Sequence, residues 1–219
     1  MTDDTKSQQP ATRRRAVTRR RLLQAALEVF IEHGIRDTPV ELICDRAGFT
    51  RGAFYSNFDS KEDLFLAILE EQVQLRLEQL EQSVNEALAT FGPERPDSVL
   101  NAVVRASMPF TDQLAVDENW YLLNAEFRAQ ALRQPELRAQ TERVQQRLLD
   151  DLANVLTNML DRIGMRLLVQ PRDAALVVIS LYDAAIERGL FEGGSGPADR
   201  LVTEILPLMT SALMEPVPN

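Results

Sequence analysis

The sequence predicts an all-α protein. Only 9 of its 219 residues are glycine, and no segment shows the strict alternation of apolar and polar residues that is typical of a half-buried strand. Apolar residues instead recur three or four positions apart, which is the spacing along one face of a helix. A chain of this length can form a small N-terminal domain and one core domain of ordinary size. We expect a disordered tail over residues 1–12, a first domain over 13–62 and a helical second domain over 63–219.

The first domain contains signals for two helices joined by a short turn. The apolar face of the first helix consists of Leu22, Leu23, Ala26, Leu27, Phe30 and Ile31. Gly34 then suits a left-handed C-terminal cap. Thr38 is a candidate N-cap for the second helix, because Pro39 fits the first helical position and Glu41 completes a capping box.

A third, short helix follows over residues 51–57. The turn before it contains Gly48, which tolerates a positive φ, and Thr50 supplies the N-cap. Phe54 and Phe58 are four positions apart and anchor this helix to the core. Ser60 predicts the cap of the next helix.

The outer face of the third helix retains Arg51, Ala53, Tyr55 and Ser56. A short projecting helix of this kind can enter a DNA major groove, where Arg51 could donate to O6 and N7 of guanine. Thr38, Tyr55 and Lys61 lie at helix ends or edges, where they could hold phosphates.

The charge distribution agrees with local DNA binding. Residues 1–61 carry 11 Lys and Arg against 8 Asp and Glu, whereas residues 62–219 carry 13 against 25. Residues 13–21 alone hold six Arg and no acid. Because the net charge is −9, DNA would repel the molecule as a whole, so contact must come through a basic tip.

This stretch resembles the DNA-binding domain of TetR/AcrR-type transcriptional regulators. The matching segments are F-x-x-H-G from Phe30, Thr38-Pro39-Val40, A-G-F-T from Ala47, R-G-A-F-Y-S-N-F from Arg51 and S-K-E-D-L-F from Ser60. The resemblance implies recognition positions at Thr50, Arg51, Gly52, Ala53, Tyr55 and Ser56, and phosphate contacts from Tyr55 and Lys61. At Asn57 many members of that family have His.

The last two helices are apolar nearly all round. They predict a homodimer interface, with contacts at Leu176, Val178, Ile179, Ile205, Leu206 and Met209. In the resembled family these two helices form a four-helix bundle with their copies. The alternative is that they form the core of a monomer.

The middle helices hold several bulky residues. A pocket for a small, mostly apolar effector would be lined by Met108, Phe110, Trp120, Leu123, Asn124, Phe127 and Met159. The alternative is that these residues fill a solid core. The cavity is implied by the family resemblance and not by the pattern.

Other classes of function lack the residues that they need. The single Cys and single His exclude a disulfide framework and make a histidine metal site untenable. Cys44 belongs to the inner face of the second helix, where core packing competes with redox sensing as its role. No catalytic constellation, cofactor motif, signal peptide or membrane-length apolar run occurs, so we expect a cytoplasmic protein that is not an enzyme.

Two functions remain. The first is a dimeric regulator, a repressor that a small effector releases from a palindromic operator in double-stranded DNA. The second is a helical protein-interaction or scaffold module whose helix-turn-helix serves packing only.

Overall fold

The computed structural model describes residues 8–90, 118–192 and 200–217. These residues form two compact units. The first unit comprises the described residues up to Gln72 together with Leu122–Glu142, and the second comprises those of Val73–Tyr121 and Arg143–Asn219. The described part is predominantly helical, so the all-α prediction is confirmed.

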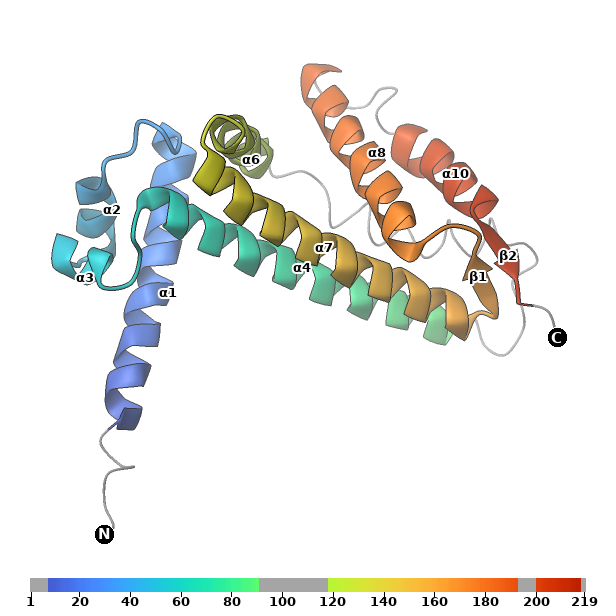
Figure 1. The fold of residues 1–219 in the computed structure, drawn as a ribbon, viewed down its shortest axis with the longest axis horizontal. Helices are drawn as coiled ribbons and strands as arrows, with labels where there is room; N and C mark the ends of the chain where they lie inside the picture. Colours follow the sequence, from blue (N-terminus) through green and yellow to red (C-terminus); the bar gives the residue numbers. More distant parts are fainter. Residues whose placement is uncertain (1–7, 91–117, 193–199, 218–219) are drawn as a thin grey trace, which may run out of the picture. The chain divides into compact units, whose positions relative to one another are not determined.

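The first unit contains the helix-turn-helix. It consists of α1 (Gln8–His33), α2 (Val40–Ala47), α3 (Arg51–Tyr55), the start of α4 (Lys61–Thr90), most of α6 (Glu118–Ala131) and the start of α7 (Pro135–Arg162). Figure 1 shows α2 and α3 against α1. The helix α1 begins at Gln8, so it includes residues that we expected in a disordered tail, and the arginine-rich segment 13–21 is helical.

Three aromatic rings form the centre of this unit. The ring of Phe65 on α4 lies 5.9 Å from that of Phe30 on α1 and 4.7 Å from that of Phe127 on α6. All three side chains are fully buried. The core of the helix-turn-helix therefore extends to a helix that lies far downstream in the sequence.

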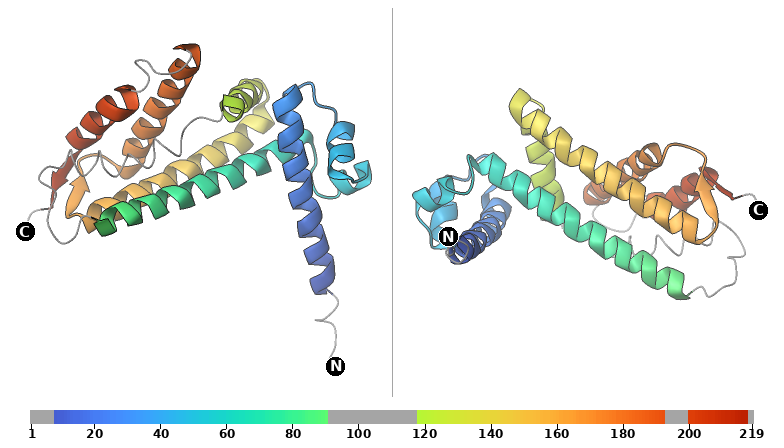
Figure 2. Two further views of the ribbon diagram at one scale, coloured as in Figure 1. Left: turned by 180° about the vertical axis from the view of Figure 1, so that it is seen from behind. Right: turned by 60° about the horizontal axis from the view of Figure 1, so that its bottom comes forward.

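The second unit is a helical layer with one small two-stranded sheet. It contains the remainder of α4 and α7, then β1 (Met165–Leu167), α8 (Pro171–Glu192), η1 (Leu201–Ile205), α10 (Leu206–Ala212) and β2 (Met214–Pro216). The second halves of α4 and α7 lie side by side (Figure 2), and Arg162 on α7 donates to the side chain of Asn85 on α4. The core cluster of this unit includes Leu80, Leu152, Leu160, Ala175 and Leu206.

The second unit adds two short strands to the expected helices, and its last helix is interrupted near Pro207, where the proline predicts a bend. The strands β1 and β2 pair antiparallel, with Arg166 opposite Glu215, but three residues each are too few to show an alternating pattern. The last helix is interrupted, because a π turn (η1) directly precedes α10. Pro207 lies at the second position of α10 and lacks the N–H of a regular helix, which explains the interruption. The sequence also predicts a helix from Asp97 or Ser98 to about Leu114, and this segment lies outside the described residues.

None of the described helices is long and apolar enough to cross a membrane.

We predict that Phe127→Ala lowers the free energy of unfolding by about 3–5 kcal/mol, because it leaves a cavity beside Phe65. Urea unfolding at a fixed protein concentration measures this change. Leu122→Ala is the matched control, since Leu122 lies on the same helix and is exposed. A loss for Phe127→Ala no larger than that of the control would contradict the role of Phe127 in the core.

Candidate nucleic-acid interface

The helix α3 is capped, anchored and exposed as the sequence predicts. The backbone N–H of Ala53 donates to Oγ1 of Thr50 at 3.3 Å, which confirms Thr50 as the N-cap. Beneath the helix, the buried ring of Phe54 contacts Phe58, with ring centroids 5.9 Å apart. The helix ends at Tyr55, so it is shorter than the expected segment 51–57.

The predicted recognition residues share one outer surface. Thr50, Arg51, Gly52, Tyr55 and Ser56 are exposed, and Ala53 is half-buried. At Gly52 a Cβ atom would approach no atom closer than Oγ1 of Thr50, at 3.7 Å. Packing within the unit therefore does not require glycine there, whereas close approach of another molecule would.

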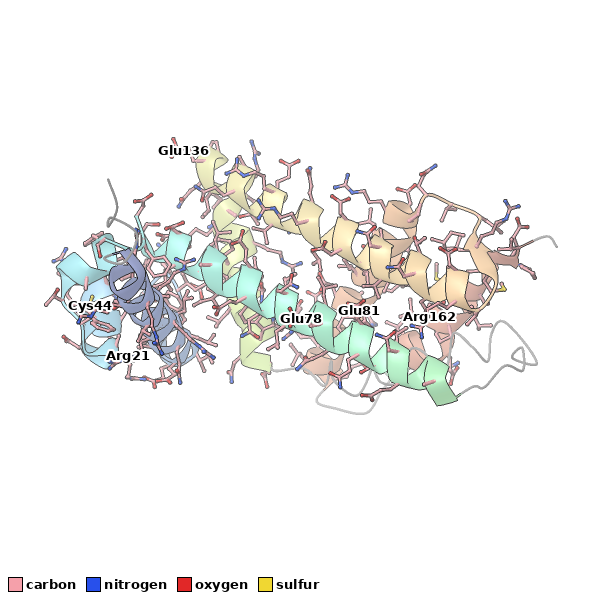
Figure 3. The ribbon with its side chains drawn as sticks, turned by 90° about the horizontal axis from the view of Figure 1, so that it is seen from below. Arg21, Cys44, Glu78, Glu81, Glu136 and Arg162 are labelled. Carbon is pink, nitrogen blue, oxygen red and sulfur yellow. The ribbon has the colours of Figure 1, made fainter. Side chains whose placement is uncertain are left out.

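A side chain of α1 stabilises the turn between α2 and α3. Gly48 has a φ of 70°, in the left-handed region that favours glycine. Arg21 of α1, labelled in Figure 3, donates to the carbonyl of Ala47 at 3.0 Å, and its guanidinium lies 4.9 Å from the ring centroid of Phe49. This contact fixes the turn on which the direction of α3 depends.

The arginines of α1 divide into two sets. Arg15 donates to the carbonyl of Ser56 at 3.0 Å, and the guanidinium of Arg19 lies 4.5 Å from the ring centroid of Phe58. These two arginines and Arg21 therefore brace α3 and the turn before it. The other set is exposed, and within the described part of the chain its side chains have no hydrogen-bond or ion-pair partner; its members are Arg13, Arg14 and Arg20.

Arg51 is also engaged in the free protein. Its Nη1 lies 2.6 Å from Oε1 of Glu41 on α2, and its guanidinium lies 5.8 Å from the ring centroid of Tyr55. Hydrogen bonding with Tyr55 and the charge of Glu41 raise the pKa of Arg51 above its ordinary value. Arg51 is therefore a cation in the structure, and its environment favours the charged form.

Two of the predicted phosphate ligands have structural roles. Thr38 is 1% exposed and donates through Oγ1 to the carbonyl of Gly34 at 2.6 Å. The expected capping box is absent, because Pro39 is the N-cap of α2 and makes no side-chain cap. Lys61 donates through Nζ to the carbonyls of Arg36 at 2.5 Å and Thr38 at 3.0 Å. A phosphate would have to compete with these two carbonyls for Lys61.

Glu126 on α6 is a residue of the site that sequence reasoning missed. Its carboxylate accepts from the backbone N–H of Ile35 at 3.0 Å and of Arg36 at 2.7 Å. Both amides follow Gly34, whose φ of 76° ends α1. The α1–α2 turn therefore bonds through its N–H groups to Glu126 and through its carbonyls to Lys61.

The thiol of Cys44 belongs to the core. Cys44 is buried on the inner face of α2 (Figure 3), and burial raises the pKa of its thiol. A raised pKa keeps the group protonated and weakly nucleophilic, which favours the packing role over redox sensing. In the described part of the chain, no three His, Cys, Asp or Glu side chains cluster as metal ligands would.

The predicted effector residues do not gather in one unit. Leu123 and Phe127 are buried in the first unit, and Phe127 packs into its aromatic core. Trp120 and Met159 belong to the second unit, where the guanidinium of Arg76 lies 5.5 Å from the ring centroid of Trp120. Asn124 is half-buried in the first unit, and Met108 and Phe110 lie outside the described residues.

The predicted dimer residues divide by exposure. Leu176 on α8 is 50% exposed and Met209 on α10 is 43% exposed. Val178 and Leu206 instead pack in the core cluster of the second unit, and Ile179 packs against that cluster. Ile205 is half-buried. Because α8 is apolar nearly all round, the sequence could not separate its inner face from its outer face.

We predict that Thr38→Val lowers the free energy of unfolding by about 1–3 kcal/mol, because it removes the donor to the carbonyl of Gly34. Thr38→Ser keeps that hydroxyl and is the matched control for the hydrogen bond. Thermal or urea unfolding of the three proteins measures the difference. Equal stability of Thr38→Val and wild type would mean that this hydroxyl does not stabilise the turn.

Known proteins resemble the chain both in this region and in fold. Residues 22–68 match the family model described as "Bacterial regulatory proteins, tetR family". The chain is 30% identical over 115 residues to the HTH-type transcriptional repressor BepR of Brucella suis biovar 1 (strain 1330), an alignment that covers 46% of this chain and 55% of that protein. The chain thus spans about half the length of this curated relative.

Two solved structures share the fold over most of the chain. One, from Mesorhizobium loti MAFF303099 and assigned to TetR-family transcriptional regulators, has a TM-score of 0.69 and 21% identity, covering 92% of this chain and 98% of its own. The other is the transcriptional regulator FadR of Bacillus subtilis in complex with stearoyl-CoA, with a TM-score of 0.62 and 22% identity, covering 87% of this chain and 97% of its own. The helix-turn-helix region is therefore similar to that of tetR-family bacterial regulatory proteins, and the fold is similar to that of the two solved structures.

Proposed function

We propose that the chain is a dimeric transcriptional repressor that binds double-stranded DNA through α3 and is released by a small effector. The observation that carries this proposal is the outer surface of α3. This helix has five residues and buries Phe54, while Arg51, Gly52 and Tyr55 are exposed. It therefore presents side chains outward. The N-terminal residues of such a helix reach base edges in a major groove.

The charge distribution supports contact with DNA at the surface that α3 and α1 form. The protein has a net charge of −9, yet Arg13, Arg14 and Arg20 are exposed on α1, the helix that braces α3. Exposed arginines near a recognition helix bind phosphates and release counterions. A DNA target implies that the protein acts in the cytoplasm.

The scaffold alternative explains less of this surface. A helix-turn-helix that served packing only would not need a glycine with free space above it at Gly52. It would also not need the exposed Arg13, Arg14 and Arg20 on the adjacent helix. The names of the relatives describe transcriptional regulators and not enzymes, which favours the same proposal.

Enrichment of duplexes from a random DNA library tests the proposal. We predict that the wild-type chain enriches an inverted repeat, and that replacing Arg13, Arg14 and Arg20 together by Ala weakens binding to all sequences. The slope of log affinity against log salt concentration should fall by about one unit for each phosphate that these arginines no longer neutralise. A reporter gene that carries the enriched DNA should be transcribed less when the chain is present, and increased transcription would indicate an activator.

The matched control removes the same charge elsewhere. Arg133, Arg138 and Arg143 are exposed on α7 and the turn before it, and their replacement by Ala should leave the salt slope unchanged. Failure of the wild-type chain to enrich any sequence would refute the proposal. Equal effects of the two triple variants would refute the role of the α1 arginines.

A homodimer would place two copies of α3 on one operator. Support comes from exposed apolar side chains on α8 and α10, among them Leu176, Leu208, Met209 and Phe191. On α8 the exposed positions Leu176, Ser180, Ala184 and Glu187 recur at helical spacing, and the two small residues would allow a second helix to approach closely. In the resembled family the corresponding helices form the dimer interface.

We predict that Leu176→Glu and Met209→Glu each give a monomer, because a carboxylate buried at a two-fold interface lies near its own copy. Size-exclusion chromatography with light scattering measures the mass. Leu132→Glu, at an exposed leucine of the first unit, is the control that should remain dimeric. A monomeric wild type at micromolar concentration would rule out the interface.

The effector would act through helices that belong to both units. The helices α4, α6 and α7 each begin in one unit and continue in the other. On α6, Trp120 precedes Glu126 by less than two turns, and Glu126 bonds to the α1–α2 turn. An effector that shifts α6 would therefore act directly on the turn that leads into the helix-turn-helix. Such an effector must bind the state with low DNA affinity more tightly.

The contacts of Trp120 suggest the chemistry of the effector. Arg76 lies over the indole ring, and its charge also acts on the half-buried Tyr182. An apolar compound with an acidic group would satisfy both the aromatic rings and the guanidinium.

We predict that apolar carboxylates change Trp120 fluorescence and release DNA, while the matching alcohols do so more weakly. Glu126→Gln should keep the fluorescence response but lose most of the coupling, which for a ~100-fold effect on affinity is about 2.7 kcal/mol. Glu118→Gln, an exposed change on the same helix, should behave as wild type. Full release of DNA from Glu126→Gln would show that the signal takes another path.

A further inference from the structure

The ion pair between Glu41 and Arg51 joins the first turns of α2 and α3. Oε1 of Glu41 lies 2.6 Å from Nη1 of Arg51, and the two side chains are 52% and 61% exposed. An exposed ion pair contributes little to folding stability. Glu41 makes no cap for α2, whose N-cap residue is Pro39. The main effect of this ion pair is therefore on the position and partners of Arg51.

The carboxylate leaves the reading edge of Arg51 available. A guanidinium has five N–H donors, and the contact with Glu41 occupies one side of Nη1. Tyr55 is a second hydrogen-bonding partner of the guanidinium, and the donors beyond these two contacts are available to a base, where a parallel pair of N–H groups matches O6 and N7 of guanine. Arg51 can therefore keep its contact with Glu41 while it donates two hydrogen bonds to a base.

The carboxylate of Glu41 also disfavours binding of a DNA phosphate by Arg51. A phosphate bound by Arg51 would lie close to the negative charge of Glu41, and the two anions repel. The O6 and N7 acceptors of guanine carry no net charge, so this repulsion is absent. Glu41 thus weakens a phosphate contact, which carries no sequence information, more than a base contact.

We propose that Glu41 is a specificity-determining positioning residue, which holds Arg51 so that Arg51 reads a guanine and does not bind a phosphate. This proposal rests on the DNA-binding function proposed above. Glu41 acts through Arg51 and need not touch DNA itself.

The test uses the duplex that the wild-type chain enriches and copies in which single guanines are replaced by 7-deazaguanine, which lacks N7. For the guanine that Arg51 reads, wild type should prefer the unmodified duplex. Glu41→Gln should reduce this preference by about tenfold, within the range of one bidentate contact. It should also bind an unrelated duplex with a salt slope steeper by about one unit, since Arg51 can then take a phosphate.

Asp45→Asn is the matched control. Asp45 is exposed on the same helix and has no ion-pair partner among the described residues, so this variant removes the same charge without touching Arg51. It should keep the wild-type preference for N7. Equal reduction of the preference in both variants would mean that only the net charge of α2 matters, and the proposal would be wrong.

A double-mutant cycle separates the proposal from the function on which it rests. In an Arg51→Ala background, Glu41→Gln should have no further effect on the preference for N7. The proposal is wrong if Glu41→Gln keeps the full preference for N7. It is also wrong if Glu41→Gln reduces this preference equally in the wild-type and Arg51→Ala backgrounds. In both cases the DNA-binding function is unaffected. If wild type enriches no duplex at all, the DNA-binding function itself is refuted.

Glu41→Asp is a second test of the proposal in case Glu41→Gln does not fold. It retains the charge but shortens the side chain, so its carboxylate should reach Arg51 poorly and the preference should fall in part. Circular dichroism of each variant checks that the helices are intact. Full preference in a folded Glu41→Asp protein would also count against the proposal.

Discussion

The turn between α1 and α2 is the constraint on which the first unit depends. Gly34 ends α1 with a left-handed φ, and its carbonyl accepts from the buried hydroxyl of Thr38. The following N–H groups donate to Glu126, and the following carbonyls accept from Lys61. Side chains from α4, from α6 and from the turn itself thus satisfy the backbone of one short turn, which is the usual condition for a partly buried loop. The position of α2 relative to α1 follows from these bonds.

The helix α3 could not exist without this framework. A five-residue segment is far shorter than an isolated helix that is stable in water. It persists because Thr50 caps its start, Phe54 anchors its centre and Arg15 binds the carbonyl of Ser56 at its end. These contacts occupy its inner side and its ends, so Arg51 and Tyr55 remain outside.

The features that the sequence predicted correctly depend on residues close together in the chain. The Thr50 and Ser60 caps and the Gly48 turn are signals within a few positions. The missed features join distant residues. Glu126 is 91 positions from Ile35, and no local pattern marks a carboxylate that will bind backbone amides. Thr38 has the signature of a cap, but its hydroxyl bonds backwards to Gly34. The burial of Val178 and the exposure of Leu176 could not be separated on a helix that is apolar on most sides.

DNA recognition by this protein depends above all on α3 reading guanine in a major groove through Arg51. Dimethyl sulfate methylates guanine N7, so protection from methylation on the enriched duplex tests this claim directly. Protected guanines should appear in two half-sites about one helical turn apart, or a multiple of it. This protection should disappear with Arg51→Ala, while some binding to the DNA backbone remains. Protection that survives Arg51→Ala, or uniform methylation in a complex that wild type forms tightly, would contradict it.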